Sequence, residues 1–338
     1  GAEAYQSGGT RRVAYLMTRD ERADDAVRRV FREQNARVLT LLGTWTADPA
    51  VAIHRARQAC KRARAVAQLL KPAAPYVAQV ENAFYREIQQ RVGYARDAEA
   101  IVEAIDFLEI GVAEPLLAES VGMLRESLAV RAVREIEQHR ASLSQQIDGA
   151  CTLLAAADRR LACMPLDALR WRDLRRGAAR KWRRCAREYA TLEAGSPSEA
   201  YHAWRRQVKY ASNQAQLLAG IEPARSATVG PRLRELAALL GHVQDLDLLE
   251  DLLRRQPDAL RIDTHVQRLR RLLADRLESL RDGARRAGGA LFSGGPGVTQ
   301  QQYSGKPAAT VRADDATSSL RPDSPDRDPD TSRRRQFG

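Results

Sequence analysis

Basic side chains with helical spacing are the residues of this chain that could do chemistry. His54, Arg57, Lys61 and Arg64 recur at intervals of three or four residues, in a stretch without Gly or Pro that is typical of a helix. Because a helix advances about 100° per residue, these four fall within an arc of roughly 80°. Four basic groups on one face repel one another. Such a face is either exposed to water or covered by an anion.

The pattern occurs a second time, 148 residues further along the chain. The corresponding pairs are His54 and His202, Arg57 and Arg205, and Lys61 and Lys209. The same offset holds without a gap outside the motif, relating Arg28 to Arg176, Arg32 to Arg180, Gly93 to Gly241 and Asp97 to Asp245. The sequence therefore contains an internal duplication. The second copy has Ser212 in place of Arg64, and Arg206 adds a cation near its basic face.

The side chains on these two faces suit a phosphate polyanion. Arginine forks bind phosphate oxygens in pairs, lysine acts as a point charge, and histidine adds a directed hydrogen bond. A single run of charge is more often a solvated helix face. Two copies in register favour a shared anion site instead.

Metal binding and catalysis have less support in the sequence. His54 and His202 are potential zinc ligands, but their neighbours on the helix face are cations, which oppose a bound metal. No nucleophile or carboxylate pair stands at a telling spacing, and the chain has no G-x-x-x-x-G-K-[ST] loop for a nucleoside triphosphate. We therefore expect a protein that is not an enzyme and that has no metal and no cofactor.

The composition restricts which ligands and which cellular compartment are expected for this protein. The 338 residues carry a formal net charge of +12, which attracts polyanions such as nucleic acid, acidic membrane surfaces or polyphosphate. Aromatic residues make up only 5%, which disfavours recognition by base stacking. The four cysteines form neither C-x-x-C pairs nor a disulfide grid, which indicates a reducing cytoplasm. No apolar run approaches the length of a membrane span, and the start does not resemble a signal peptide.

Periodicity and breakers predict an all-helical chain without strands. The expected helices cover about residues 20–42, 54–70, 76–92, 97–108, a hairpin over 117–160 with Gly149 as an interruption, then 166–192, 197–218, 232–240, 245–255 and 258–286. A loop is expected over 220–231. Asp97 and Asp245 are expected to cap helix N-termini or to pair with an arginine of the anion site.

These features resemble the conserved histidine α-helical domain family, known as CHAD. The resemblance rests on a His that opens a helix, with Arg and Lys at the next turns, in two copies that are each followed by Gly-x-x-x-Asp, here residues 93–97 and 241–245. It covers about residues 13–290 and implies a pseudo-twofold pair of helical bundles around a basic channel. It also implies binding of inorganic polyphosphate and association with polyphosphate granules or with polyphosphate-related enzymes. No catalytic domain of that kind is visible in this sequence.

The sequence thus predicts an all-α fold of two tandem, internally duplicated antiparallel bundles. The repeats cover about residues 13–145 and 146–290, between a flexible leader (1–12) and a disordered tail (291–338). The expected function is non-catalytic binding of polyphosphate in the cytoplasm, with non-specific nucleic-acid binding as the alternative and an enzyme of phosphate metabolism as a weaker one. The expected binding residues are Arg28, Arg32, His54, Arg57, Lys61, Arg64, Arg176, Arg180, His202, Arg205, Arg206 and Lys209.

Overall fold

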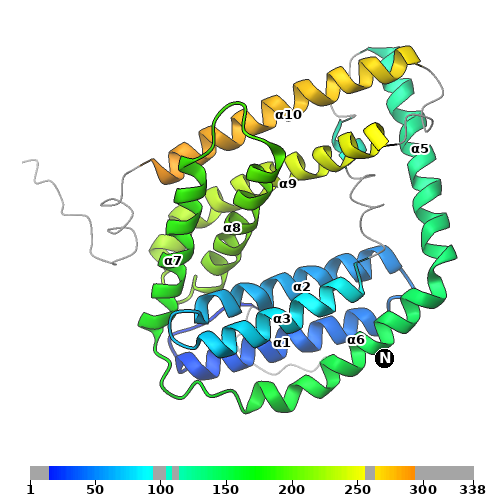
Figure 1. Cartoon of the computed structure of the whole chain (residues 1–338). Coiled ribbons are helices and arrows are strands. Elements are labelled where there is room, and N and C mark those ends of the chain that lie inside the picture. Colours follow the sequence, from blue (N-terminus) through cyan, green and yellow to red (C-terminus); the bar gives the residue numbers. More distant parts are fainter. Residues whose placement is uncertain (1–14, 94–103, 109–113, 256–262, 294–338) are drawn as a thin grey trace, which may run out of the picture.

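The computed structural model describes residues 15–93, 104–108, 114–255 and 263–293, and all regular structure within these ranges is helical (Figure 1). The helices are α1 (Ala23–Gly43), α2 (Pro49–Leu70), α3 (Pro75–Arg91), α5 (Pro115–Gln138), α6 (Arg140–Ala162), α7 (Trp171–Ala190), α8 (Ser198–Leu217), α9 (Pro223–Arg255) and α10 (Asp263–Phe292). A short helical segment also covers residues 104–108. The prediction of an all-α fold is therefore confirmed. No helix in the described ranges is long and apolar enough to cross a membrane.

Local sequence explains where several of these helices begin. Pro49 and Pro75 start α2 and α3, where a proline costs no helical hydrogen bond. The Asp48 carboxylate caps α2 by accepting a hydrogen bond from the Val51 amide at 3.1 Å. The start of α3 agrees with the predicted residue 76 to within one position, whereas α2 begins five residues before the predicted start at His54.

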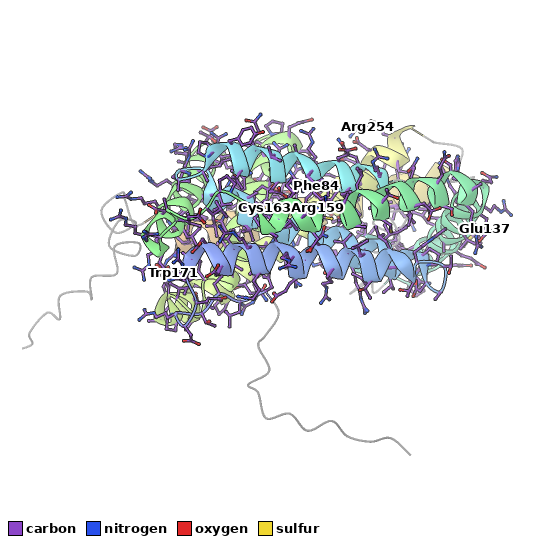
Figure 2. All side chains as sticks on the ribbon, turned by 90° about the horizontal axis from the view of Figure 1, so that it is seen from below. Phe84, Glu137, Arg159, Cys163, Trp171 and Arg254 are labelled. Atoms are coloured by element: carbon purple, nitrogen blue, oxygen red, sulfur yellow. The ribbon has the colours of Figure 1, made fainter. Side chains whose placement is uncertain are left out.

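Two hydrophobic cores hold the helices together. The first contains fully buried side chains of α1, α2 and α3, such as Phe31, Ile53 and Tyr85, together with Leu154 and Leu161 of α6. Figure 2 shows α6 lying between α1 and α3 on the outer side of this bundle, near the labelled Phe84, Arg159 and Cys163. The second core is built by α7 to α10, with residues 104–108 and one face of α5 packed against them.

The two cores do not follow the two sequence repeats. The predicted boundary between residues 145 and 146 falls inside α6, whose buried leucine and isoleucine side chains pack in the first core. Residues 104–108 and α5 belong to the first repeat by sequence but pack in the second core. Each core is therefore completed across the repeat boundary, because an amphipathic helix packs on whichever apolar surface its connection can reach.

Helix α2 joins the two bundles by packing against both α7 and α8. Gly177 of α7 allows the closest approach, since a Cβ atom there would lie 2.1 Å from the Leu69 carbonyl oxygen. Gln214 of α8 donates a hydrogen bond to the Ala65 carbonyl at 3.0 Å. In Figure 1 the first bundle and the pair α9 and α10 form opposite sides of a frame, which α7 and α8 close at one end and α5 at the other.

Helix α9 corrects the predicted breaks in the second repeat. The loop expected over 220–231 ends at Pro223 and the break expected at Gly241 is absent, because α9 is continuous with Pro231 inside it. Side chains at helical spacing on both sides of these positions are buried in the second core, namely Leu233, Leu236, Leu240, Val243 and Leu246. Their burial offsets the hydrogen bond that Pro231 removes, a cost of about 3 kcal/mol.

Other predicted boundaries also shift. Gly149 lies inside α6, and the hairpin turn falls at His139 instead. Leu291 and Phe292, which the sequence placed in the tail, are buried in the second core. The predicted leader, Asp97 and residues 294–338 of the predicted tail lie outside the described residues.

Candidate anion-binding site

A basic cavity of about 530 Å³ lies where α2, α8 and α9 meet. Its walls hold six Lys and Arg side chains and two histidines against a single carboxylate, that of Asp245. The lining residues are His54, Gln58, Lys61, Arg62 and Arg64 of α2, Arg205, Arg206, Lys209, Tyr210 and Asn213 of α8, and Ala238, Gly241, His242 and Asp245 of α9. The imbalance of charge makes this cavity the strongest candidate for an anion site among the described residues.

The amphipathic sequences of α2 and α8 place the basic side chains in the cavity. In α2 the buried face carries small residues, including Ala56, Ala63 and Ala67, which fix that face in the first core. Lys61 stands on the opposite side of the same helix. In α8 the buried Trp204 and Val208 fix the orientation in the same way, and the basic residues emerge on the other side.

Arg64 is held in place by hydrogen bonds from α3. Its Nε donates to Asn82 Oδ1 at 3.2 Å and its Nη1 donates to Gln89 Oε1 at 2.7 Å. The guanidinium remains part of the cavity wall. An arginine with its rotamer fixed loses less entropy when it binds an anion.

Arg57 points elsewhere, although it lies on the same predicted arc. Its Nη1 donates to the Gln89 carbonyl oxygen at 2.7 Å, and Gln89 Nε2 donates back to the Arg57 carbonyl oxygen at 3.0 Å. A Cβ atom on Gly93 would lie 3.1 Å from Arg57 Nη1. Arg57 therefore ties α2 to the C-terminal end of α3 and does not line the cavity.

Tyr210 is the aromatic residue of the cavity wall, and two cations flank its ring. The Lys181 ammonium lies 4.8 Å and the Arg64 guanidinium 5.8 Å from the ring centroid. Lys181 Nζ also donates to Gln207 Oε1 at 2.8 Å. Burial lowers the pKa of Lys181 to about 8. Burial raises the pKa of Tyr210, against the opposing effect of Arg64 and Arg206, so the phenol stays neutral and can donate a hydrogen bond.

The two histidines of the duplicated motif have different surroundings. His54 lines the cavity, and its Nε2 is hydrogen-bonded to Gln58 Nε2 at 2.6 Å. His202 Nε2 lies 2.9 Å from Oδ2 of the buried Asp247. Arg281 and Ser198 both donate to the other oxygen of Asp247, at 2.8 and 3.0 Å. His202 is thus part of a partly buried polar network around Asp247 and is not among the residues that line the cavity.

Four more of the predicted residues do not meet across the cavity. Arg28 contacts Asp24 at 2.9 Å and Asp167 at 2.8 Å, and Arg32 contacts Asp158 at 2.9 Å. Arg176 and Arg180 are exposed on α7. The predicted residues that do line the cavity are His54, Lys61, Arg64, Arg205, Arg206 and Lys209. Asp24, four residues before Arg28, is the sequence signal that could have marked Arg28 as ion-paired.

Several lining residues were missed by sequence reasoning. Gln58 corresponds to Arg206, and Arg62, which was placed off the arc, corresponds to Tyr210. The repeat register therefore held a signal for Gln58, whose counterpart was predicted, but none for Arg62 and Tyr210, neither of which was predicted. Asp245 was expected as a helix cap or an arginine partner, but it lies within α9 rather than at its N-terminus. His242 stacks on Phe107 with ring centroids 4.0 Å apart, a contact that only the fold reveals.

Metal ligands do not cluster among the described residues, and two of the four cysteines are buried. No group of three or more His, Cys, Asp or Glu side chains there could hold a metal ion. Cys60 and Cys185 are buried, and burial raises the pKa of each thiol to about 12. Such thiols are poor nucleophiles and poor metal ligands at neutral pH.

Comparisons with known proteins agree with this architecture. No curated protein matches the chain. The crystal structure of the CHAD domain from the plant Ricinus communis matches with a TM-score of 0.60 at 19% sequence identity, covering 83% of this chain and 96% of that chain, which shows a shared fold. The model of the CHAD domain family matches residues 25–254. Because that match spans more than half of the sequence, this chain belongs to the CHAD domain family.

Proposed function

We propose that the protein binds inorganic polyphosphate in the cavity between α2, α8 and α9. The observation that carries the proposal is the convergence of six Lys and Arg side chains on about 530 Å³ that holds one carboxylate. These cations come from helices in both sequence repeats. Membership of the CHAD family supports the same ligand, because the resemblance seen in the sequence implies polyphosphate binding.

The arrangement of the cations suits a linear phosphate chain. Lys61 and Arg64 lie one turn apart on α2, and Arg206 and Lys209 lie one turn apart on α8. A helical turn rises about 5.4 Å, so each helix offers cations at regular steps along a chain of phosphates. Arg64, fixed by Asn82 and Gln89, provides a preorganised fork for phosphate oxygens.

We propose binding without turnover. Asp245 is the one carboxylate in the described wall, and general acid–base or two-metal phosphoryl transfer uses several such groups. The wall also contains no serine or cysteine nucleophile among its described residues. A non-catalytic site of this kind would serve to attach the protein to polyphosphate granules.

The environment of Tyr210 favours polyphosphate over nucleic acid. Single-stranded nucleic acid gains much of its affinity from bases stacked on aromatic rings. Tyr210 lies in the wall, but the cations of Lys181 and Arg64 already flank its ring. Two cations so close to the ring favour contact with a phosphate backbone at this position over stacking of a base.

Competition binding tests this proposal. Purified full-length protein is loaded with labelled single-stranded DNA at physiological salt and titrated with polyphosphate, DNA or RNA of matched phosphate number. We expect polyphosphate to displace the label at a phosphate concentration at least about tenfold lower. Equal displacement by all three would overturn the choice of ligand, and release of orthophosphate in the presence of Mg²⁺ would overturn the absence of turnover.

A further inference from the structure

Arg62 lines the basic cavity although it lies off the helical arc of His54, Lys61 and Arg64. Among the described residues no carboxylate pairs with its guanidinium. Burial lowers the pKa of Arg62, and the positive charge of Arg37 acts in the same direction. Arg62 is therefore a partly desolvated cation that something other than an acidic side chain must hold in place.

An aromatic ring supports Arg62 where a carboxylate is missing. The Arg62 guanidinium lies over the Tyr15 ring, 5.3 Å from its centroid. A cation within about 6 Å of a ring centroid is attracted by the negative face of the ring. Tyr15 Oη also donates a hydrogen bond to the Arg62 backbone carbonyl oxygen at 3.2 Å. One side chain, itself only 1% exposed, thus contacts both the backbone and the charged group of Arg62.

The backbone of Tyr15 is strained. Its φ of 71° lies in the left-handed region, and no other non-glycine residue in the part of the chain that the structure describes has a positive φ. This conformation is unfavourable for a bulky side chain and persists only where the surrounding contacts fix it. The strain therefore indicates that the position of the Tyr15 ring is determined by more than local preference.

The residues after Tyr15 are fixed to the end of α8. The Met17 amide donates a hydrogen bond to the Leu217 carbonyl oxygen at 2.9 Å, and the Met17 side chain is fully buried. A Cβ atom on Gly220 would lie 2.4 Å from the Met17 carbonyl oxygen, so this approach requires glycine. Residues 15–17 therefore connect α2, through Arg62, with α8, and these two helices carry the basic faces of the cavity.

We propose that Tyr15 is a positioning residue of the anion site, which holds the Arg62 guanidinium in the cavity wall and so raises the affinity for polyphosphate. This inference rests on the proposed function. Tyr15 is not among the residues that line the cavity, so it acts through Arg62 and does not touch the ligand. A cation that is fixed before binding loses less entropy when the anion binds. Hydrogen bonds fix Arg64 in this way, and the Tyr15 ring does the same for Arg62.

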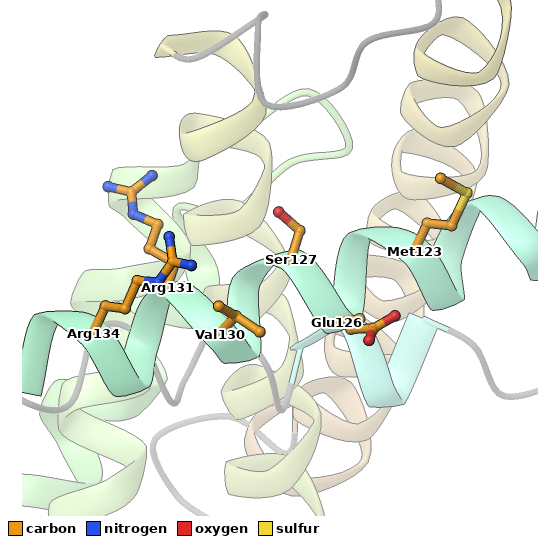
Figure 3. Close-up of a pocket in the computed structure, with 6 residues that line it drawn as sticks. All are labelled: Met123, Glu126, Ser127, Val130, Arg131 and Arg134. Atoms are coloured by element: carbon orange, nitrogen blue, oxygen red, sulfur yellow. The ribbon is translucent and has the colours of Figure 1, made fainter.

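Arg134 of α5 provides a matched cation outside the cavity. It is exposed, and it lines a shallow hollow whose residues all belong to that one helix (Figure 3). Helix α5 closes the end of the frame opposite α7 and α8 (Figure 1). Removing Arg134 lowers the net charge as much as removing Arg62 does but leaves the cavity wall unchanged.

Calorimetric titration of the full chain with polyphosphate tests the role of Tyr15. We expect Arg62→Gln to weaken binding about tenfold and Arg134→Gln less than about twofold, because only the first removes a charge-assisted contact. Tyr15→Leu removes the ring and should weaken binding about fivefold, whereas Tyr15→Phe keeps the ring and should stay within about twofold. The double variant, Tyr15→Leu with Arg62→Gln, should bind no more weakly than Arg62→Gln alone, because Tyr15 acts through Arg62.

A second buried tyrosine separates positioning from stability. Tyr85 is fully buried in the same core, and its Oη donates a hydrogen bond to the Phe31 carbonyl oxygen at 3.4 Å. Tyr85→Leu should lower the urea midpoint of unfolding, as Tyr15→Leu does, but leave polyphosphate affinity within about twofold. Tyr15→Met repeats the test with a longer apolar side chain if Tyr15→Leu does not fold. Affinities that follow the urea midpoints across these variants would overturn the proposal.

Two other results would also overturn it: wild-type affinity in Tyr15→Leu, or a loss in the double variant equal to the product of the two single losses. The same titrations with single-stranded DNA distinguish this proposal from the proposed function. If DNA binds as tightly as polyphosphate, the choice of ligand is wrong, but the coupling between Tyr15 and Arg62 should appear with DNA as well. A wild-type chain that binds neither polyanion would overturn both proposals.

Discussion

The helices that contain His54 and His202 share one sequence motif, but the two histidines have different partners in the structure. His54 lines the basic cavity, whereas His202 contacts the buried Asp247, which also accepts hydrogen bonds from Ser198 and Arg281. The repeat register explains the difference. Ala50, which cannot donate a side-chain hydrogen bond, stands in the first copy where Ser198 stands in the second. A duplicated motif therefore does not guarantee a duplicated site, because each copy acquires its own neighbours.

The same divergence appears behind the cavity wall. Lys181 of α7, which lies against Tyr210, corresponds to Glu33 of α1, which pairs with Arg29 at 2.8 Å. Tyr210 itself corresponds to Arg62, whose guanidinium lies 5.3 Å from the Tyr15 ring. At this position of the register the first copy thus contributes a cation, Arg62, to the cavity wall, and the second contributes a neutral donor, Tyr210, next to a partly desolvated lysine.

The largest effect is expected from reversing charge inside the cavity. Arg206→Glu with Lys209→Glu should lower polyphosphate affinity by at least about 100-fold, because each charge-assisted contact contributes about 1.5–3 kcal/mol. The matched control is Arg176→Glu with Arg180→Glu, which makes the same change on the exposed face of α7, outside the cavity wall. Calorimetric titration should show a loss of less than about fivefold for the control, because distant charges are screened. Equal losses would place the site on the general basic surface.

The next effect compares the two repeats by the loss of unfolding free energy when a carboxylate partner of each is removed. Asp247→Ala leaves Arg281 and His202 without their buried carboxylate and should lower the free energy of unfolding by about 3 kcal/mol. Asp158→Ala removes the exposed partner of Arg32 and should cost less than about 1 kcal/mol. Urea denaturation followed by circular dichroism measures both. A loss below 1 kcal/mol for Asp247→Ala would mean that the network contributes little to the fold.

Lys181 should give stability a pH dependence that Glu33 cannot supply. Its pKa is about 8 in the folded protein and 10.5 as an ordinary lysine, so between these values the unfolded state binds more protons. The contribution of Lys181 to the free energy of unfolding therefore rises with pH through this window, by at most on the order of 3 kcal/mol. Below pH 8 both states are protonated and the contribution is flat.

The variant Lys181→Met isolates this effect. Denaturation of the wild type and the variant at pH 7.5 to 9.5 keeps below the range in which tyrosines ionise. We expect the stability of the wild type to rise relative to that of Lys181→Met across these values. A constant difference between the two proteins would show that Lys181 keeps an ordinary pKa.

The smallest effect compares the two histidines directly. His54→Ala should weaken polyphosphate binding by about three- to tenfold, because it removes one hydrogen bond from the cavity wall. His202→Ala should leave affinity within about twofold and lower the free energy of unfolding by about 1–2 kcal/mol instead, because its neighbour Asp247 is buried. Binding and denaturation measured on both variants show whether each histidine contributes to affinity or to stability. Equal losses of affinity would restore the equivalence that the sequence suggested.

The sequence by itself determined the features that depend on local periodicity. The all-α class, the basic faces of the two motif helices and the start of α3 follow from residues a few positions apart, and the repeat register follows from comparing two such local patterns. Helical spacing is a property of a short segment, so it can be read without knowing what the segment packs against. The six predicted residues that line the cavity belong to this local pattern.

Tertiary structure decided which basic residues converge and which are paired elsewhere. Arg57 faces the cavity on a helical wheel, yet the C-terminal end of α3 supplies the Gln89 carbonyl that binds it. His202 is held by Asp247, whose own helix continues through the breaks expected at Pro231 and Gly241 because its apolar side is buried. The exchange of α5 and α6 between the two cores likewise depends on which apolar surfaces lie within reach. Such contacts join residues far apart in the sequence, and burial there outweighs the local preferences that the sequence displays.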